Sequence, residues 1–150
     1  MLAVGSRAPE FTLADQDGRD ASLTDFLNRG RLLLYFYPAD FTPGCTREAC
    51  MIRDLYADIA GAGMSVVGIS PQLPQRHQDF RSHYALPFTL LADPQRTVIR
   101  MYDASGLLGL RVRRITYLID RDRRIRDAVQ AEVRIATHEE FVRRALSTQA

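Results

Sequence analysis

Residues Tyr35–Cys50 read YFYPADFTPGCTREAC, and this stretch joins a predicted strand to a predicted helix through a polar turn. The apolar run Leu32–Tyr37 is typical of a strand that is buried on both faces of a sheet. Pro38 ends that run, and from about Cys45 to Ala60 apolar residues recur at the spacing of an amphipathic helix. Cys45 is therefore expected at or near the amino terminus of a helix.

That position favours a reactive thiolate at Cys45. The thiolate is the nucleophilic form of cysteine, and the unpaired backbone N–H groups at a helix start stabilise negative charge. The hydroxyl of Thr42, three residues earlier, can donate a hydrogen bond to the sulfur or to an oxygen that arrives beside it. Both cysteines of the chain lie in this stretch, with Cys50 five residues after Cys45. Two cysteines this close, in a compartment that we expect to be reducing, indicate redox or metal chemistry rather than a structural disulfide.

Three other interpretations of the cysteines are weaker. Free cysteines are often inert core residues, but a cysteine directly after Pro43-Gly44 is poorly placed for core packing. A zinc site is disfavoured because His77, His83 and His138 fall in separate segments without ligand spacing, and we expect all three on the surface or on helix faces. A thioredoxin-type disulfide exchanger is disfavoured because the sequence has no Cys-x-x-Cys.

The composition is typical of a soluble globular protein. Of the 150 residues, 46% are hydrophobic and 25% are charged. No apolar run approaches the roughly 18 residues of a membrane-spanning helix, so no membrane partner is expected. The segment Met1–Arg7 lacks the features of a secretory signal, and we expect a cytoplasmic protein. The formal charge is only +2 and the arginines form no single clustered face, so nucleic-acid binding is not expected.

The order Pro38, Thr42, Cys45 resembles the active-site motif of the peroxiredoxins, and the position of Cys50 resembles the bacterioferritin-comigratory, or Q-type, branch of that family. Other segments that resemble this branch are residues 8–13 (APEFTL), 15–18 (DQDG), 23–26 (LTDF), 88–91 (FTLL) and 114–120 (RITYLID). The resemblance covers nearly the whole chain. The sequence departs from the family pattern at Ala39, where a basic residue is common, and in the segment Ala104–Val112, which is short against the longer loop of that branch.

The rest of the chain supplies further strands and helices. The turn Asp17-Gly18 between Phe11–Leu13 and Ala21–Leu23 predicts an amino-terminal β-hairpin. The other predicted elements are a short helix capped by Ser22 or Thr24 and ending before Gly30, a strand over Ser65–Ser70, a helix from Pro74 to about Tyr84, a strand over Phe88–Leu91, a brief helix around Val98–Met101, a loop over Ala104–Gly109, a hairpin of Ile115–Ile119 and Ile125–Val129, and a carboxy-terminal helix that begins with a capping box of Thr137 and Glu140.

These elements predict one α/β domain over residues 1–150. The helix from Cys45 to Ala60 and its two flanking strands should form a right-handed crossover with parallel strands. The pattern is that of a thioredoxin-like fold, with a mixed central β-sheet flanked by helices and an amino-terminal β-hairpin.

The resemblance assigns roles to residues of the central stretch. It implies that Cys45 attacks a peroxide, that Cys50 later forms a disulfide with it, and that Thr42 assists as a donor. Pro38 would keep water from the sulfur. The residues expected to form the substrate pocket are Gly44, Glu48, Tyr37 and Phe41, of which Glu48 is also expected in the first helical turn.

Arg114 is expected to complete the catalytic set. It begins a predicted strand in the segment that resembles the one carrying the family's active-site arginine, and its charge would stabilise the thiolate and hold the peroxide oxygens. Arg113 is a competitor for this role. Successive strand residues point to opposite faces, so only one of the two can point at Cys45, and we expect Arg114.

The reaction that the resemblance implies is the reduction of hydrogen peroxide and organic hydroperoxides. Cys45 becomes a sulfenic acid, Cys50 condenses with it to a disulfide, and thioredoxin or a glutaredoxin-like dithiol protein reduces that disulfide. No metal or organic cofactor is implied, and the chain is expected to be a monomer or a weak homodimer. The alternative is a non-catalytic redox sensor or partner-binding switch that uses the same cysteines without turnover.

Overall fold

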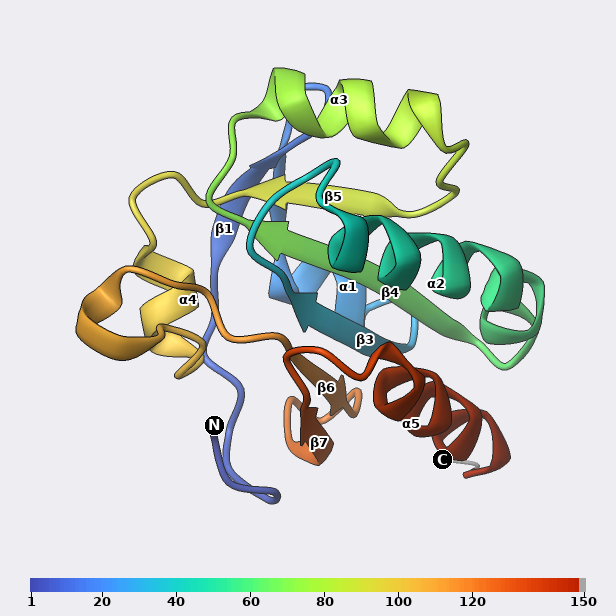
Figure 1. Cartoon of the computed structure of the whole chain (residues 1–150). Helices are drawn as coiled ribbons and strands as arrows, with labels where there is room; N and C mark the ends of the chain where they lie inside the picture. Colours follow the sequence, from blue (N-terminus) through green and yellow to red (C-terminus); the bar gives the residue numbers. More distant parts are fainter. Residues whose placement is uncertain (149–150) are drawn as a thin grey trace.

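The computed structural model describes residues 1–148, and seven strands within that range form one mixed sheet (Figure 1). The strands are β1 Thr12–Asp15, β2 Asp20–Ser22, β3 Arg31–Phe36, β4 Met64–Ser70, β5 Thr89–Ala92, β6 Ile115–Ile119 and β7 Ile125–Gln130. Their order across the sheet is β2-β1-β5-β4-β3-β6-β7. β3, β4 and β5 are parallel to one another, and the outer strands pair antiparallel with their neighbours. The predicted hairpin of β1 and β2 is confirmed.

Helices cover both faces of the sheet. In the described range they are α1 Leu23–Leu27, α2 Pro43–Gly61, α3 Pro74–His83, α4 Thr97–Met101, the 3₁₀ turn η1 Leu107–Gly109 and α5 Ile135–Ser147. Side chains of α2, α3 and α5 pack on one face, and side chains of α1 and α4 pack on the other. The predicted parallel crossover of β3, α2 and β4 is confirmed. None of the helices described for residues 1–148 is long and apolar enough to cross a membrane.

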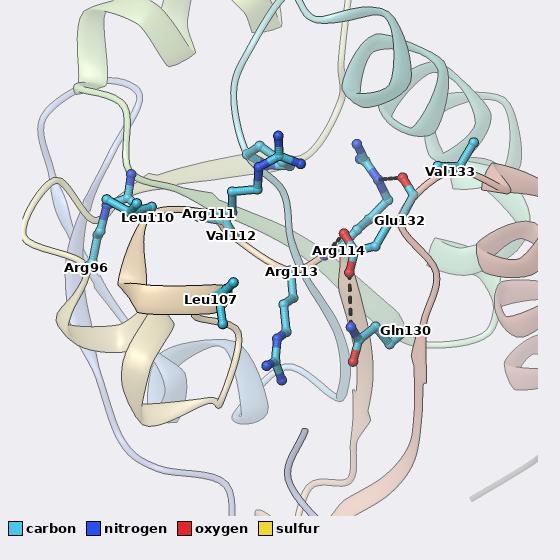
Figure 2. Close-up of a pocket in the computed structure, with 12 residues that line it drawn as sticks. Arg96, Leu107, Leu110, Arg111, Val112, Arg113, Arg114, Gln130, Glu132 and Val133 are labelled. Atoms are coloured by element: carbon cyan, nitrogen blue, oxygen red, sulfur yellow. Dashed lines mark hydrogen bonds between the residues drawn. The ribbon is translucent and has the colours of Figure 1, made fainter.

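The pairing of β3 with β6 brings two distant parts of the sequence together. The strands are antiparallel, and Phe36 at the end of β3 lies opposite Ile115 at the start of β6. The chain leaves β3 into the turn that leads to α2, so this turn and the residue before Ile115 meet at the same edge of the sheet. That residue is Arg114, whose surroundings Figure 2 shows.

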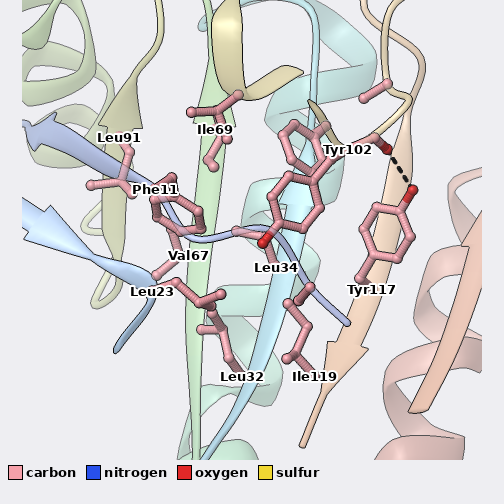
Figure 3. Packing of buried hydrophobic residues seen from close by; sticks show 14 of the residues in the cluster. Phe11, Leu23, Leu32, Leu34, Val67, Ile69, Leu91, Tyr102, Tyr117 and Ile119 are labelled. Carbon is pink, nitrogen blue, oxygen red and sulfur yellow. Dashed lines mark hydrogen bonds between the residues drawn. The ribbon is translucent and has the colours of Figure 1, made fainter. Parts of the chain in front are cut away.

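The six residues of β3 are all buried, because both faces of the strand are covered. Successive side chains point to opposite faces, so Leu32, Leu34 and Phe36 join one core cluster while Leu33 and Tyr35 join the other. Figure 3 shows the first cluster, in which the Tyr117 hydroxyl donates to the carbonyl oxygen of Tyr102 at 2.6 Å.

The helix starts differ in part from the prediction. α2 begins at Pro43, slightly before the predicted start, since proline at the first helical position loses no hydrogen bond. Ser22 caps α1 and forms a capping box with Asp25, so Ser22 is the cap. The predicted Thr137 box is wrong. α5 begins at Ile135, which is buried, and its start is fixed by packing rather than by a side-chain cap.

Candidate active site

Cys45 is the third residue of α2, and its side chain is only 2% exposed. Thr42 is the N-cap residue, and the Thr46 N–H donates to the Thr42 carbonyl oxygen at 2.8 Å. The N–H groups of Gly44 and Cys45 precede this first intrahelical bond and point toward the helix start, where they stabilise negative charge. The predicted position of Cys45 at a helix start is confirmed. The cysteine is a free thiol.

The hydroxyl of Thr42 has a backbone partner. It donates to the carbonyl oxygen of Ala39 at 2.8 Å. A hydroxyl has a single hydrogen to donate, so it does not donate to the Cys45 sulfur in this arrangement. A hydrogen bond from Thr42 to a bound oxygen therefore requires rotation of the hydroxyl away from Ala39.

Arg114 links the start of β6 to two acidic groups of α2. Its Nη2 donates to Cys45 Sγ at 3.4 Å, and its Nη1 donates to Glu48 Oε1 at 2.8 Å. Its Nε donates to the carbonyl oxygen of Glu132 at 3.3 Å. Each of the three guanidinium nitrogens therefore has an acceptor, and these hydrogen bonds fix the orientation of the group. Burial lowers the pKa of Arg114, but the charges of Glu48 and Cys45 outweigh this effect and raise the pKa above its ordinary value. The positive charge beside the sulfur is therefore permanent.

Gly44 makes room for this guanidinium. A β-carbon placed on Gly44 would lie 3.1 Å from Arg114 Nη2, tighter than ordinary van der Waals contact. A larger residue would require the guanidinium to shift by a few tenths of an ångström.

Glu48 is completely buried, and it lies in the second turn of α2 rather than in the predicted first turn, because the helix starts at Pro43. Burial raises the pKa of Glu48, and the nearby charges of His138 and Arg114 act in the opposite direction without cancelling that effect. The side chain thus serves as an acceptor for Arg114 inside the protein and does not act on the helix dipole.

The structure brings Arg114 to Cys45 and leaves Arg113 aside. Figure 2 shows the two arginine side chains pointing in opposite directions, as strand alternation requires. Arg114 is 5% exposed, whereas Arg113 is partly exposed. Both line a pocket of about 500 Å³ that also reaches Pro38. The rim of this pocket carries the exposed apolar side chains Leu107, Leu110 and Val133, and its other cationic side chains are Arg96 and Arg111.

None of the residues predicted to form the substrate pocket, Gly44, Glu48, Tyr37 and Phe41, lines this pocket. The side chain of Tyr37 points into the core below α2 and α3. Its hydroxyl donates to Asp40 Oδ1 at 2.5 Å. Asp40 Oδ2 lies 2.6 Å from Nδ1 of His77, whose Nε2 lies 3.0 Å from the carbonyl oxygen of Leu91. This buried chain of polar groups ties the turn before α2 to α3 and β5.

Phe41 also lies outside the pocket. It has a φ of 66°, which is uncommon for a residue other than glycine. Its ring packs against Phe80, and the guanidinium of Arg76 lies 4.5 Å from its centroid. Phe41 therefore anchors the turn on α3.

Cys50 is half-buried on α2, and it too is a free thiol. Five residues along a helix correspond to an advance of about 7.5 Å and a rotation of about 140°. A disulfide requires Cα atoms within about 7 Å and side chains that face each other. Cys45 and Cys50 therefore cannot be joined while α2 keeps this conformation.

The three histidines are expected on the surface or on helix faces, and all three lie on helices. His77 and His138 are buried, and only His83 is exposed. Helical spacing carried a signal for His138, because it precedes Phe141, Val142 and Ala145 on the buried face of α5. Within residues 1–148, no group of three or more His, Cys, Asp or Glu side chains is arranged to hold a metal ion.

Sequence and structure comparisons place these features in a family. The model of the AhpC/TSA family matches residues 4–128. A putative peroxiredoxin of Mycobacterium tuberculosis (strain ATCC 25618 / H37Rv) is 43% identical over 152 residues, which cover 97% of this chain and 96% of the relative. The residues matched by the family model include both Cys45 and Arg114.

Solved structures confirm the thioredoxin-like peroxiredoxin fold. The crystal structure of peroxidoxin BcpB from Mycobacterium tuberculosis matches with a TM-score of 0.91 and 35% identity, covering 98% of this chain and 97% of that chain. A structure of the bacterioferritin comigratory protein of Xanthomonas campestris matches with a TM-score of 0.81 and 26% identity, covering 91% of this chain and 90% of that one. The chain belongs to the AhpC/TSA family and, within it, to the peroxiredoxins.

Proposed function

We propose that this chain reduces hydrogen peroxide and organic hydroperoxides with the thiolate of Cys45. As a peroxiredoxin it is a thiol peroxidase. The observation that supports Cys45 as the attacking group is the buried guanidinium of Arg114, which donates to the sulfur with one nitrogen and to Glu48 with another. Alkyl peroxide reduction is named for the Xanthomonas campestris relative, which supports organic hydroperoxides as substrates here.

In the first step the thiolate of Cys45 attacks the terminal oxygen of the peroxide. An S–O bond forms, the O–O bond breaks, and its electron pair leaves with the second oxygen, which takes up a proton and departs as water or an alcohol. Cys45 is oxidised to a sulfenic acid. Arg114 and the backbone N–H groups at the start of α2 stabilise the charge that develops on the departing oxygen. The Thr42 hydroxyl can join them after it leaves Ala39, and Pro38 shields the sulfur from water.

In the second step the thiol of Cys50 attacks the sulfenic sulfur, and a disulfide forms with release of water. Since the two cysteines are too far apart on α2, the helix must unwind locally first. Thioredoxin or a glutaredoxin-like dithiol protein would then reduce the disulfide. We expect this cycle in the reducing cytoplasm, carried out by a monomer or a weak homodimer.

Variants of the two cysteines test this function. Cys45→Ser should abolish consumption of hydrogen peroxide and of a bulky hydroperoxide in the presence of thioredoxin, its reductase and NADPH. Cys50→Ser should still undergo one round of oxidation to sulfenic acid, because its attacking thiolate is intact. Retained turnover in Cys45→Ser would contradict the assignment. Stoichiometric oxidation of the wild type without turnover would instead favour a redox switch over a peroxidase.

A further inference from the structure

His138 is buried beside Glu48, yet no step of the proposed reaction uses it. Its Nε2 lies 2.9 Å from the carbonyl oxygen of Ala131. A carbonyl oxygen only accepts hydrogen bonds, so Nε2 carries a hydrogen. The charge of the ring therefore depends on Nδ1, which lies 2.9 Å from Thr116 Oγ1 and 3.5 Å from Glu48 Oε2.

The carboxylate of Glu48 is only half satisfied. Oε1 accepts a hydrogen bond from Arg114 Nη1. Oε2 is buried, and no residue of the described range donates a hydrogen bond to it. An isolated buried carboxylate oxygen is costly. His138 Nδ1 is placed to offset that cost when it is protonated, because it then brings a positive charge to the unpaired oxygen.

The charges around this pair do not balance without His138. The titratable and charged groups near Glu48 and His138 are Cys45 on α2, Arg114 just before β6, Tyr35 on β3 and Glu132 before α5. Once Cys45 is a thiolate, two buried negative charges, on Cys45 and Glu48, share the single positive charge of Arg114. Glu132 is exposed to solvent, and the buried Tyr35 stays neutral because burial raises its pKa well above the ordinary value.

We propose that His138 is a positioning residue of the peroxidase site that carries a proton while Cys45 is a thiolate and pairs with Glu48 from the side opposite Arg114. This inference rests on the proposed function. Ionisation of Cys45 is then balanced within the protein, since the sulfur loses one proton and His138 gains one through solvent. When His138 neutralises part of the charge of Glu48, the positive charge of Arg114 is less offset by Glu48 and stabilises the sulfur and the peroxide more strongly.

Oxidation of Cys45 removes its negative charge, and His138 then releases the proton that it had gained. Two electrons pass from the sulfurs to the O–O bond, one S–S bond forms, and hydrogen peroxide becomes two waters. The thiol of Cys50 supplies one proton for these waters, and one more is needed because Cys45 starts as a thiolate. A protonated His138 supplies that proton when the negative charge of Cys45 disappears. Without it, the second proton must come from the solution.

Proton uptake during oxidation tests the inference. Reduced protein in weak buffer near neutral pH is oxidised to the disulfide with one equivalent of hydrogen peroxide, and a pH indicator follows the solution. His138→Gln keeps an amide donor for Ala131 but cannot carry charge, so it should take up about one proton more per disulfide than the wild type. Glu48→Gln should show the same increase, because it removes the group that holds the proton on His138. Arg143→Gln, which removes an exposed charge from the same helix, should match the wild type.

Equal proton uptake in the wild type, His138→Gln and Glu48→Gln would overturn the role of His138. If His138→Gln does not fold, Glu48→Gln still decides the question. Wild-type protein that reduces no peroxide would overturn the proposed function and this inference with it, so the two failures are distinguishable.

The first oxidation provides a second readout, measured as the second-order rate of Cys45 oxidation in a Cys50→Ser background. Adding His138→Gln should lower this rate at neutral pH by about tenfold, the effect of one uncompensated charge at this distance. An unchanged rate in His138→Gln would contradict the inference.

Discussion

Arg114 gives Cys45 its electrostatic environment through one rigid side chain. Its two Nη groups reach different acceptors, Sγ of Cys45 and Oε1 of Glu48, and its Nε is held by the backbone of Glu132. A planar guanidinium with fixed donors suits this task because it holds the sulfur and still offers an N–H edge to an arriving oxygen. Position 113 lacks this geometry because it faces the other side of the strand.

Replacing Arg114 should therefore slow the first oxidation much more than replacing its neighbour. Arg114→Ala should lower the second-order rate of Cys45 oxidation by about 100-fold or more, the effect of losing a preorganised donor at the reacting atoms. Arg114→Lys should recover only part of that loss, because lysine keeps the charge without the fork of donors. Arg113→Ala is the matched control and should stay near the wild-type rate in stopped-flow oxidation with hydrogen peroxide. Similar losses at both positions would argue against the geometry.

Individual site residues differ in how well the sequence predicts them. Cys45 at a helix start follows from the local pattern of hydrophobicity. Alternation shows only that one of Arg113 and Arg114 faces Cys45, and the resemblance to the peroxiredoxins favours Arg114. The buried positions of His77 and His138 do not follow from a local pattern alone. A histidine is buried only where each ring nitrogen finds a partner, and those partners, Asp40 for His77 and Thr116 for His138, are distant in sequence.

Among the elements, α2 must both pack against the sheet and open at its start, and these two requirements conflict. Its buried face, formed by Ala49, Ile52, Leu55 and Ile59, holds the helix against the sheet. Its first two turns must open if Cys45 and Cys50 are to form a disulfide. The turn before the helix is anchored on α3 through Asp40 and Phe41, so the opening should begin after that anchor and stop before Leu55.

Amide hydrogen exchange in the two redox states should show this local opening. In the reduced protein the amides from Arg47 to Arg53 should be protected by helical hydrogen bonds. In the protein with the Cys45–Cys50 disulfide these amides should exchange much faster, while those from Leu55 to Gly61 keep their protection as an internal control. Cys50→Ser treated with peroxide should keep the reduced pattern. Unchanged protection of residues 47–53 in the disulfide form would contradict local unwinding.

At the scale of the whole molecule, the sequence predicts the helices and strands better than it predicts which strands pair with one another in the sheet. Buried strands, the β3–α2–β4 crossover and both hairpins follow from periodicity and turn residues. The pairing of β1 with β5, and of β3 with β6, joins strands far apart in sequence, and no local pattern specifies it. The resemblance to the peroxiredoxins did specify the fold, because a family resemblance carries the long-range pairings that local patterns lack.

The free energy of unfolding should depend on pH because Glu48 is buried in the folded protein. Burial raises the pKa of Glu48 above its ordinary value of 4.5, so the folded protein binds this proton more tightly than the unfolded chain does. The stabilising contribution is therefore complete below the unfolded pKa and is lost as the pH rises through the folded pKa. Glu48→Gln lacks this titration. Its free energy of unfolding relative to that of the wild type should accordingly increase as the pH rises from about 4 to about 7.

Urea unfolding of the reduced proteins at several pH values measures this difference. Glu139→Gln is the matched control, because Glu139 is a partly exposed glutamate on α5 that pairs with Arg143 at the surface, and its difference from the wild type should change little with pH. The sign of the slope is the decisive result. A difference between Glu48→Gln and the wild type that stays constant, or that shrinks as the pH rises, would contradict a raised pKa of Glu48 in the folded protein.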